Sequence, residues 1–84
     1  MQCYFNLAGA VHNPDNEGID MPSLIEARRE AVRFIAEYVR DHPDLVWGGE
    51  EVRVEVTDET RLVLFTVIIL GVDAPATAGQ FLPK

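Results

Sequence analysis

The hydrophobic positions of this chain repeat with two different periods, and the change between them predicts its elements. Over residues 3–8 and 51–57, apolar side chains recur at about every second position, which is typical of strands with one buried face. Residues 24–41 carry apolar side chains at helical spacing instead. The last run, 61–69, is apolar at both alternating sets of positions, so we expect a fourth strand with two apolar faces that something must cover.

Local signals define the two ends of the helix. Ser23 followed three residues later by Glu26 is a capping box, in which the hydroxyl accepts from the N–H of Glu26 and the carboxylate reaches back. Pro43 ends the helix because proline cannot continue the backbone ladder, so we expect a helix over Leu24–Asp41.

The apolar arc of this helix is wide. It covers about 200°, against the roughly 100° needed to dock on one sheet. The arc comprises Leu24, Ile25, Ala27, Ala31, Val32, Phe34, Ile35, Tyr38 and Val39. Part of the helix is therefore expected to meet a second surface.

The connections complete the predicted topology. Turn formers fill residues 10–16, a short extended piece at 17–21 is expected to pair beside the first strand, and the polar turn 57–60 makes a hairpin of the last two strands. The sequence therefore predicts an α+β fold of order β-β-α-β-β, in which a small antiparallel sheet carries one long helix on one face.

The domain boundary is expected near residue 70. Residues 1–70 contain every predicted element, and residues 71–84 are low in charge and contain prolines. We expect a single domain followed by a mobile tail, with the alternative that Phe81 and Leu82 fold back over the last strand.

Composition and charge limit the classes of partner that this protein is expected to bind. The 84 residues are 48% hydrophobic and 25% charged, as in an ordinary soluble domain, and the net charge is −7. Nucleic acid and anionic membranes are disfavoured partners, because both attract clustered Lys and Arg. The apolar run Leu62–Leu70 is too short to span a bilayer and no secretion signal is visible, so we expect a cytoplasmic protein. Cys3, the single cysteine, is expected in the core.

Charges on the helix pair by position. Arg29, Arg33 and Arg40 each follow a glutamate by three residues. We interpret them as a solvated face of ion pairs rather than as a stripe that binds an anion.

A metal or catalytic site has only weak support in the sequence. Residues 13–20 resemble the start of a calcium loop, but Leu24 stands where the bidentate glutamate belongs and a strand precedes the loop. The candidate metal ligands are His12, Asp15, Glu17 and Asp20. They define the alternative function, a metal-binding or enzymatic accessory. We expect no cofactor and no enzymatic activity, since no nucleophile lies near a base in the sequence.

The leading hypothesis is an interaction or regulatory module that self-associates. Its expected contact residues lie on the two-faced strand and at the one cation inside the apolar helix arc: Val63, Phe65, Val67, Ile69 and Arg28. We expect a homo-oligomer or an unknown protein partner that covers this strand. A monomer whose tail packs over the strand is the competing arrangement.

Three segments resemble a known family. They are the opening Tyr4-Phe5-x-Leu7, the long stretch from Asp15-x-Glu17-Gly18-Ile19 to Glu30-Ala31, and Val54-x-Val56-Thr57-Asp58-Glu59. Together they resemble the short bacterial proteins of domain of unknown function 6894 over residues 3–69. They are more faintly similar to the partner-binding half of HicB-type antitoxins. Asn6 stands where the closer family often has histidine, and the resemblance implies no catalytic residue.

Overall fold

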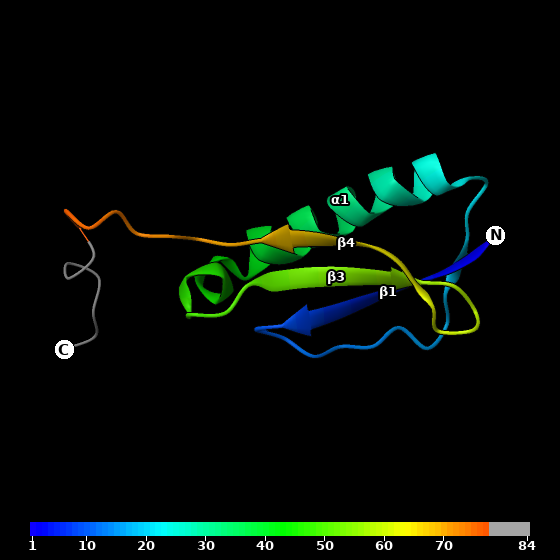
Figure 1. Ribbon diagram of the computed structural model, residues 1–84, viewed down its shortest axis with the longest axis horizontal. Helices are drawn as coiled ribbons and strands as arrows, with labels where there is room; N and C mark the ends of the chain where they lie inside the picture. Colours follow the sequence, from blue (N-terminus) through cyan, green and yellow to red (C-terminus); the bar gives the residue numbers. More distant parts are fainter. Residues whose placement is uncertain (78–84) are drawn as a thin grey trace.

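The alternating segments become strands and the helical segment becomes a single long helix (Figure 1). The computed structural model describes residues 1–77. Its elements are β1 (Gln2–Gly9), β2 (Ile19–Asp20), α1 (Leu24–Asp41), the 3-10 helix η1 (Pro43–Trp47), β3 (Val52–Thr57) and β4 (Val63–Ile69). The α+β class and the β-β-α-β-β order are confirmed, with η1 added before β3.

The strands form one antiparallel sheet of order β2-β1-β3-β4. Leu7 of β1 lies opposite Val54 of β3, which in turn lies opposite Val67 of β4. Residues opposite one another point to the same face of a sheet. The alternate apolar residues of three strands are therefore collected on the face that α1 covers.

The core forms between α1 and this face. Ala27, Ala31 and Ile35 are the buried helix residues, and the small alanines allow α1 to approach the sheet closely. The buried apolar strand residues are Cys3, Phe5, Leu7, Val52, Val54 and Val56. The prediction that Cys3 is a core residue is confirmed, and burial raises the pKa of its thiol.

The helix has the predicted bounds. Ser23 caps it by accepting a hydrogen bond from the N–H of Glu26 at 3.1 Å. The Glu26 carboxylate pairs with Arg29, as predicted for the outer face. Arg40 pairs with Asp41 rather than with Glu37, because the adjacent carboxylate lies nearer.

The wide apolar arc of α1 is only partly buried. Ile25 and Val32 remain 61% and 54% exposed. One sheet can cover only one stripe of a helix, so these side chains lie outside its footprint.

The fourth strand differs from the prediction at its start. It begins at Val63 rather than at Arg61, because the Asp58 carboxylate accepts from the N–H groups of Thr60 and Leu62 and holds residues 58–62 as a turn. A register shift at Val56/Thr57 follows. Val63 is consequently 49% exposed, and Leu64 packs against the core in its place.

Beyond β4 the described chain continues away from the sheet in Figure 1. The predictions about Phe81 and Leu82 concern residues outside the described range, as does the predicted mobility of residues 78–84. Among residues 1–77 there is no helix with the length and the apolar content needed to cross a membrane.

Candidate functional site

The outer edge of β1 is closed by the loop that follows it. Leu7 and Asn13 exchange backbone hydrogen bonds of 3.1 Å in both directions, and Cys3 pairs with Ile19 of β2. Between these two points, the Asp15 carboxylate accepts from the N–H of Phe5 at 3.1 Å. A side chain thus takes the place of a strand partner at the centre of this edge, which we call the β1 edge.

Asp15 is held by backbone donors on several sides. It also accepts from the N–H groups of Glu17 and Gly18, each at 3.0 Å. Partial burial acts to raise the pKa of Asp15, but these bonds, the bond from Phe5 and the charge of Arg61 outweigh it and leave the pKa below its usual value. The carboxylate therefore stays ionised and serves the structure of the loop.

Sequence reasoning missed the role of Asn6. Its Oδ1 accepts from the N–H of Asp15 at 2.9 Å, and its Nδ2 donates to the carbonyl of Glu55 at 3.0 Å. Asn6 thereby ties the loop to the sheet. The signal that could have found it is an amide side chain inside a strand, with one acceptor and two donors to satisfy.

The structure does not bring the four candidate metal ligands together. Asp15 accepts from three backbone N–H groups, and Asp20 pairs with the N-terminal ammonium at 3.1 Å. His12 and Glu17 are exposed. Within residues 1–77, no three His, Cys, Asp or Glu side chains gather where they could hold a metal ion.

An open groove of about 620 Å³ runs between this loop and α1. Phe5 and Phe34 contribute apolar surface, and their rings meet edge to face at 6.3 Å. The helix residues along the groove are Glu30, Arg33, Phe34 and Glu37. This flank of α1 therefore faces the β1 side of the sheet.

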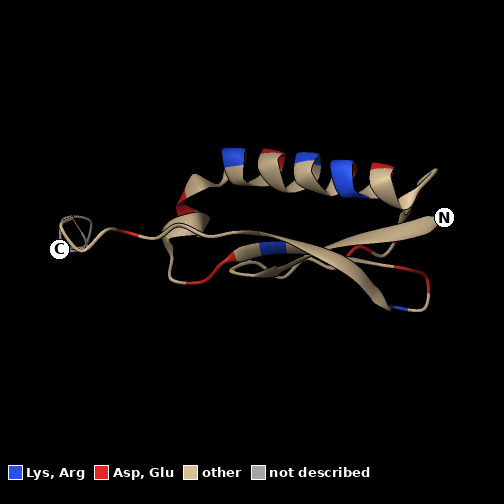
Figure 2. Ribbon diagram, turned by 45° about the horizontal axis from the view of Figure 1, so that its top comes forward, with Lys and Arg blue, Asp and Glu red and all other residues tan. Residues whose placement is uncertain are grey.

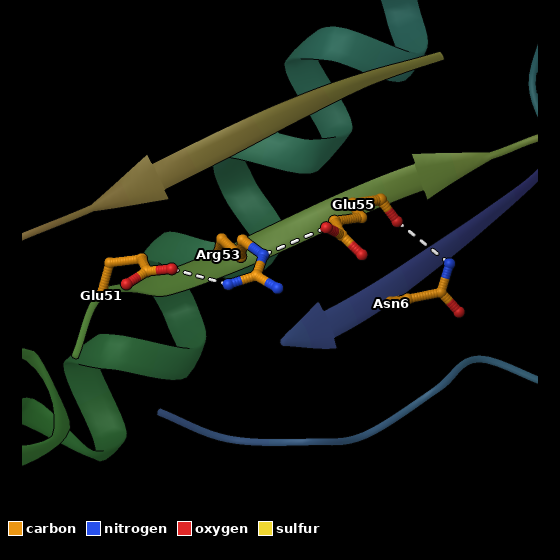
Figure 3. A network of polar contacts seen from close by, with 4 residues as sticks. All are labelled: Asn6, Glu51, Arg53 and Glu55. Atoms are coloured by element: carbon orange, nitrogen blue, oxygen red, sulfur yellow. Dashed lines mark hydrogen bonds and ion pairs between the residues drawn. The ribbon is translucent and has the colours of Figure 1, made fainter. Parts of the chain in front are cut away.

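The face of the sheet opposite α1 is polar on β3. Figure 3 shows Arg53 between Glu51 and Glu55, with N–O distances of 2.6 and 3.1 Å. A backbone hydrogen bond to its own N–H and the Arg53 side chain lower the pKa of Glu51. Hydrogen bonds to Glu55 and Glu51 raise that of Arg53. This face needs no apolar cover over β3.

The other edge of the sheet is that of β4, and the ladder shows which backbone groups point outward there. Ala10 donates to the carbonyl of Glu51, the residue that precedes β3. Hydrogen bonds to a given neighbour recur at every second residue of a strand, so the odd-numbered residues of β3 bond to β1. Val52, Val54 and Val56 must then bond to their partners Ile69, Val67 and Phe65. The alternation leaves the N–H and C=O groups of Thr66 and Ile68 pointing away from the sheet.

Apolar side chains surround these outward groups. Ile68 is 58% exposed, and the other exposed apolar residues here are Leu62, Val63, Leu70 and Val72. No residue from Leu62 to Val72 is charged, and Figure 2 shows β4 without a coloured segment. Natural edge strands usually carry charges or prolines that block pairing. We call the outward backbone groups and these exposed side chains the β4 edge.

Only part of the predicted contact set is on this surface. Val63 is exposed, while Phe65, Val67 and Ile69 are partly buried toward α1. The exposed residues Leu62, Ile68 and Leu70 lie on the surface although the predicted contact set lacks them. The sequence alone did not show which residues of the strand would be exposed, because the strand's orientation relative to the helix was not known.

A second apolar surface adjoins the β4 edge. Since Glu30, Phe34 and Glu37 face the β1 side, the opposite flank of α1 lies toward β4. We call this the helix flank, and it comprises Ile25, Arg28, Val32, Ala36 and Val39. Its residues are exposed except for Val39, which is partly buried. The charged Arg and Glu residues of α1 lie mainly on the side turned from the sheet in Figure 2.

Comparison with known proteins identifies the family. The family described as domain of unknown function DUF6894 matches residues 2–71, which is most of the chain. The chain belongs to this family, and the resemblance seen in the sequence is confirmed. No curated protein and no solved structure shows a significant match to it.

Proposed function

We propose that this member of the DUF6894 family is a protein-interaction module that associates with a second copy of itself through the β4 edge and the helix flank. The observation that carries the proposal is the unprotected β4 edge. Its outward backbone groups come from an uncharged, apolar strand, and such an edge pairs readily with another strand.

The contrast with the rest of the surface supports this location. The β1 edge is closed by Asn13, Asp15 and Ile19, and the open face of β3 carries an ion-pair network. The described residues cover neither Ile68 nor Val32. Exposed apolar residues of β4 and of the helix flank thus lie toward the same lateral edge of the sheet, while Ile19 at the β1 edge and Trp47 of η1 are exposed elsewhere.

The helix flank would contribute the second part of the contact. Because α1 contacts β3 and β4, pairing of two β4 strands would bring two α1 helices together above one continuous sheet. Strands are spaced by about 4.8 Å, so the two helix axes would lie about 10 Å apart, which is the distance of packed helices. The two helix flanks would then be buried against each other as the two β4 strands pair.

Light scattering during size-exclusion chromatography of the full chain tests the proposal. We expect a dimer for the natural chain at micromolar concentrations and a monomer for Ile68→Lys, because a charge on the edge blocks strand pairing. A monomeric natural chain would overturn the proposal, as would an Ile68→Lys dimer of unchanged affinity.

Ile19→Lys is the matched control. Ile19 is also an exposed isoleucine in a strand, at 49%, but it lies at the β1 edge. This variant introduces the same charge and should remain dimeric. Circular dichroism confirms that both variants are folded before their association is compared.

A further inference from the structure

We infer that the groove between α1 and residues 13–19 binds a basic segment of a different protein, which places an apolar side chain on the base of the groove and cationic side chains on its acidic walls. We call this groove the β1 groove. A monomer and the proposed dimer would both present it, because it lies on the β1 side of α1 and the β4 edge lies on the other side.

The β1 groove exists because α1 does not lie centrally over the sheet. Most contacts of α1 with the sheet are with β3 and β4, so the loop 13–19 borders an open space above β1. The rings of Phe5 and Phe34 meet at the base of this space. Phe34 is only partly buried, and Pro14 and Ile19 of the loop are exposed. The groove therefore offers apolar surface to a ligand.

The walls of the groove carry an excess of negative charge. Four carboxylates line it against a single cation, Arg33; they belong to Asp15, Glu17, Glu30 and Glu37. None of the ion pairs within residues 1–77 includes Glu17, Glu30 or Glu37. Arg33 is in none of them either, so the ion pair that the sequence predicts between Arg33 and Glu30 is not formed. A ligand that enters the groove meets carboxylates that are available to pair with a cation.

The spacing of residues along α1 adds to this match. Glu30, Phe34 and Glu37 lie on the same flank, because residues three and four apart share one face of a helix. At a rise of 1.5 Å per residue, the two glutamates are about 10.5 Å apart along the helix, and Phe34 lies between them. A ligand that pairs with both therefore needs two cationic groups with an apolar group between them.

The loop wall is formed before a ligand binds. Asp15 accepts from three backbone N–H groups, and its own N–H donates to the side chain of Asn6. These bonds hold the loop in place beside β1. Binding therefore costs little ordering of the protein, which favours affinity.

Charge also selects among the possible occupants. A second copy of this chain carries a net charge of −7 and is a poor match for an acidic groove. The phosphates of a nucleic acid would meet carboxylates of like charge. A metal ion lacks a ligand set, since no three His, Cys, Asp or Glu side chains gather within residues 1–77. A basic segment of another protein matches both the charge and the apolar surface.

Fluorescence anisotropy of a labelled peptide, titrated with the full chain, tests the inference. The probe is a nonapeptide with a central phenylalanine, arginines two positions to either side, and glycine or serine elsewhere. In an extended chain these three side chains point to one side and the arginines lie about 13 Å apart, within reach of both glutamates. We expect saturable binding that weakens as salt is added. Absence of binding would overturn the inference.

Single substitutions locate the binding and give its sign. Glu30→Gln and Glu37→Gln should each weaken binding roughly two- to fivefold, because each removes one ion pair. Glu50→Gln is the matched control, since this exposed glutamate does not line the groove, and it should bind like the natural chain. Arg33→Gln should instead tighten binding roughly two- to fivefold, because it removes the one cation of the groove. An equal loss in the control, or weaker binding by Arg33→Gln, would contradict this placement.

The apolar contact is tested by changing the probe rather than the protein. A peptide with alanine in place of phenylalanine should bind about tenfold more weakly, because it buries less apolar surface. Equal affinities would show that charge alone is recognised, which is not what we infer. In NMR spectra, amide signals of residues 13–19 and 30–37 should shift on addition of the probe. Shifts confined to β4 would place the ligand at the wrong edge.

Circular dichroism confirms that each variant is folded before its affinity is compared with that of the natural chain.

Discussion

The two edges of this sheet differ in how their outward backbone groups are hydrogen-bonded. At the β1 edge, Asn13 and Ile19 bond to the strand and the Asp15 carboxylate takes the N–H between them. At the β4 edge, the outward groups of Thr66 and Ile68 meet no partner within residues 1–77, and the surrounding side chains are apolar. The difference teaches that residues 1–77 complete the backbone ladder at one edge of the sheet and leave it open at the other, where the proposed second copy would pair.

Distance along the sequence explains why the β1 edge is closed from within. Asp15 lies ten residues from Phe5, so closing this short loop onto its own strand costs little conformational entropy. The described chain after β4 instead leaves the sheet, as Figure 1 shows. Within residues 1–77 no segment returns to the β4 edge, and in the proposed dimer a second copy would close it.

The largest effect is expected from proline at two neighbouring positions of β4. Val67→Pro removes an N–H that bonds to Val54 and should lower the free energy of unfolding by about 3 kcal/mol or more. Ile68→Pro removes an outward N–H and should cost the monomer less than about 1 kcal/mol. Urea denaturation at a concentration where the chain is monomeric measures both. Equal costs would show that the assignment of outward groups is wrong.

The next largest effect is expected at the closed edge. Asp15→Ala leaves the N–H groups of Phe5, Glu17 and Gly18 without their acceptor and should destabilise the fold by about 2–3 kcal/mol. Asp20→Ala is the control, because this exposed carboxylate pairs only with the terminal ammonium and should cost less than about 1 kcal/mol. Thermal unfolding of the two variants gives the comparison. Similar values would argue against Asp15 as the closing group.

Gly18→Ala should have an intermediate effect on the same loop. Gly18 has a φ of 76°, and an added Cβ would lie 2.7 Å from Nε2 of Gln2 and 2.9 Å from the Tyr4 ring. We expect a loss of about 1–2 kcal/mol in urea denaturation. Gly48→Ala is the matched control, since its φ is −87° and its nearest contact would be 3.6 Å. The loop account is wrong if the control loses as much.

The smallest effect is expected from pH. The folded-state pKa of Asp15 lies below its ordinary value, so the stability it contributes is present above that ordinary value, about 3.9, and is lost as pH falls through the folded-state pKa. Asp58 and Glu51 act in the same direction. The urea midpoint of the natural chain should therefore fall between about pH 5 and pH 3. In Asp15→Asn the fall should be shallower, and an identical slope would remove Asp15 from this account.

Much of the architecture could be predicted from local residues. The helix has the predicted bounds because Ser23 and Pro43 act on their immediate neighbours. The burial of the alternating valines of β3 is also a local effect, since a period of two puts them all on one face of the strand. The β-β-α-β-β succession of elements along the chain also followed from these signals, whereas the order of the strands within the sheet did not.

The candidate site was less predictable. Val63 was expected beside Phe65, Val67 and Ile69, but the irregularity opposite Thr57 turns it outward and brings Leu64 inward. The role of Asn6 depends on Glu55, which lies 49 residues away in the sequence. Neither contact can be read from residues near in sequence, because each depends on the register between strands.

The sequence by itself determined the four strands and the helix as elements, the limits of α1 and the excess of apolar residues, because these depend on spacing and on caps that act within a few residues. The tertiary structure decided where that excess lies. The order of the strands placed β4 at an edge of the sheet. The contact between α1 and the sheet left Ile25 and Val32 exposed, on the flank of α1 that lies toward β4. These outcomes depend on contacts between distant segments, and only the folded chain brings such segments together.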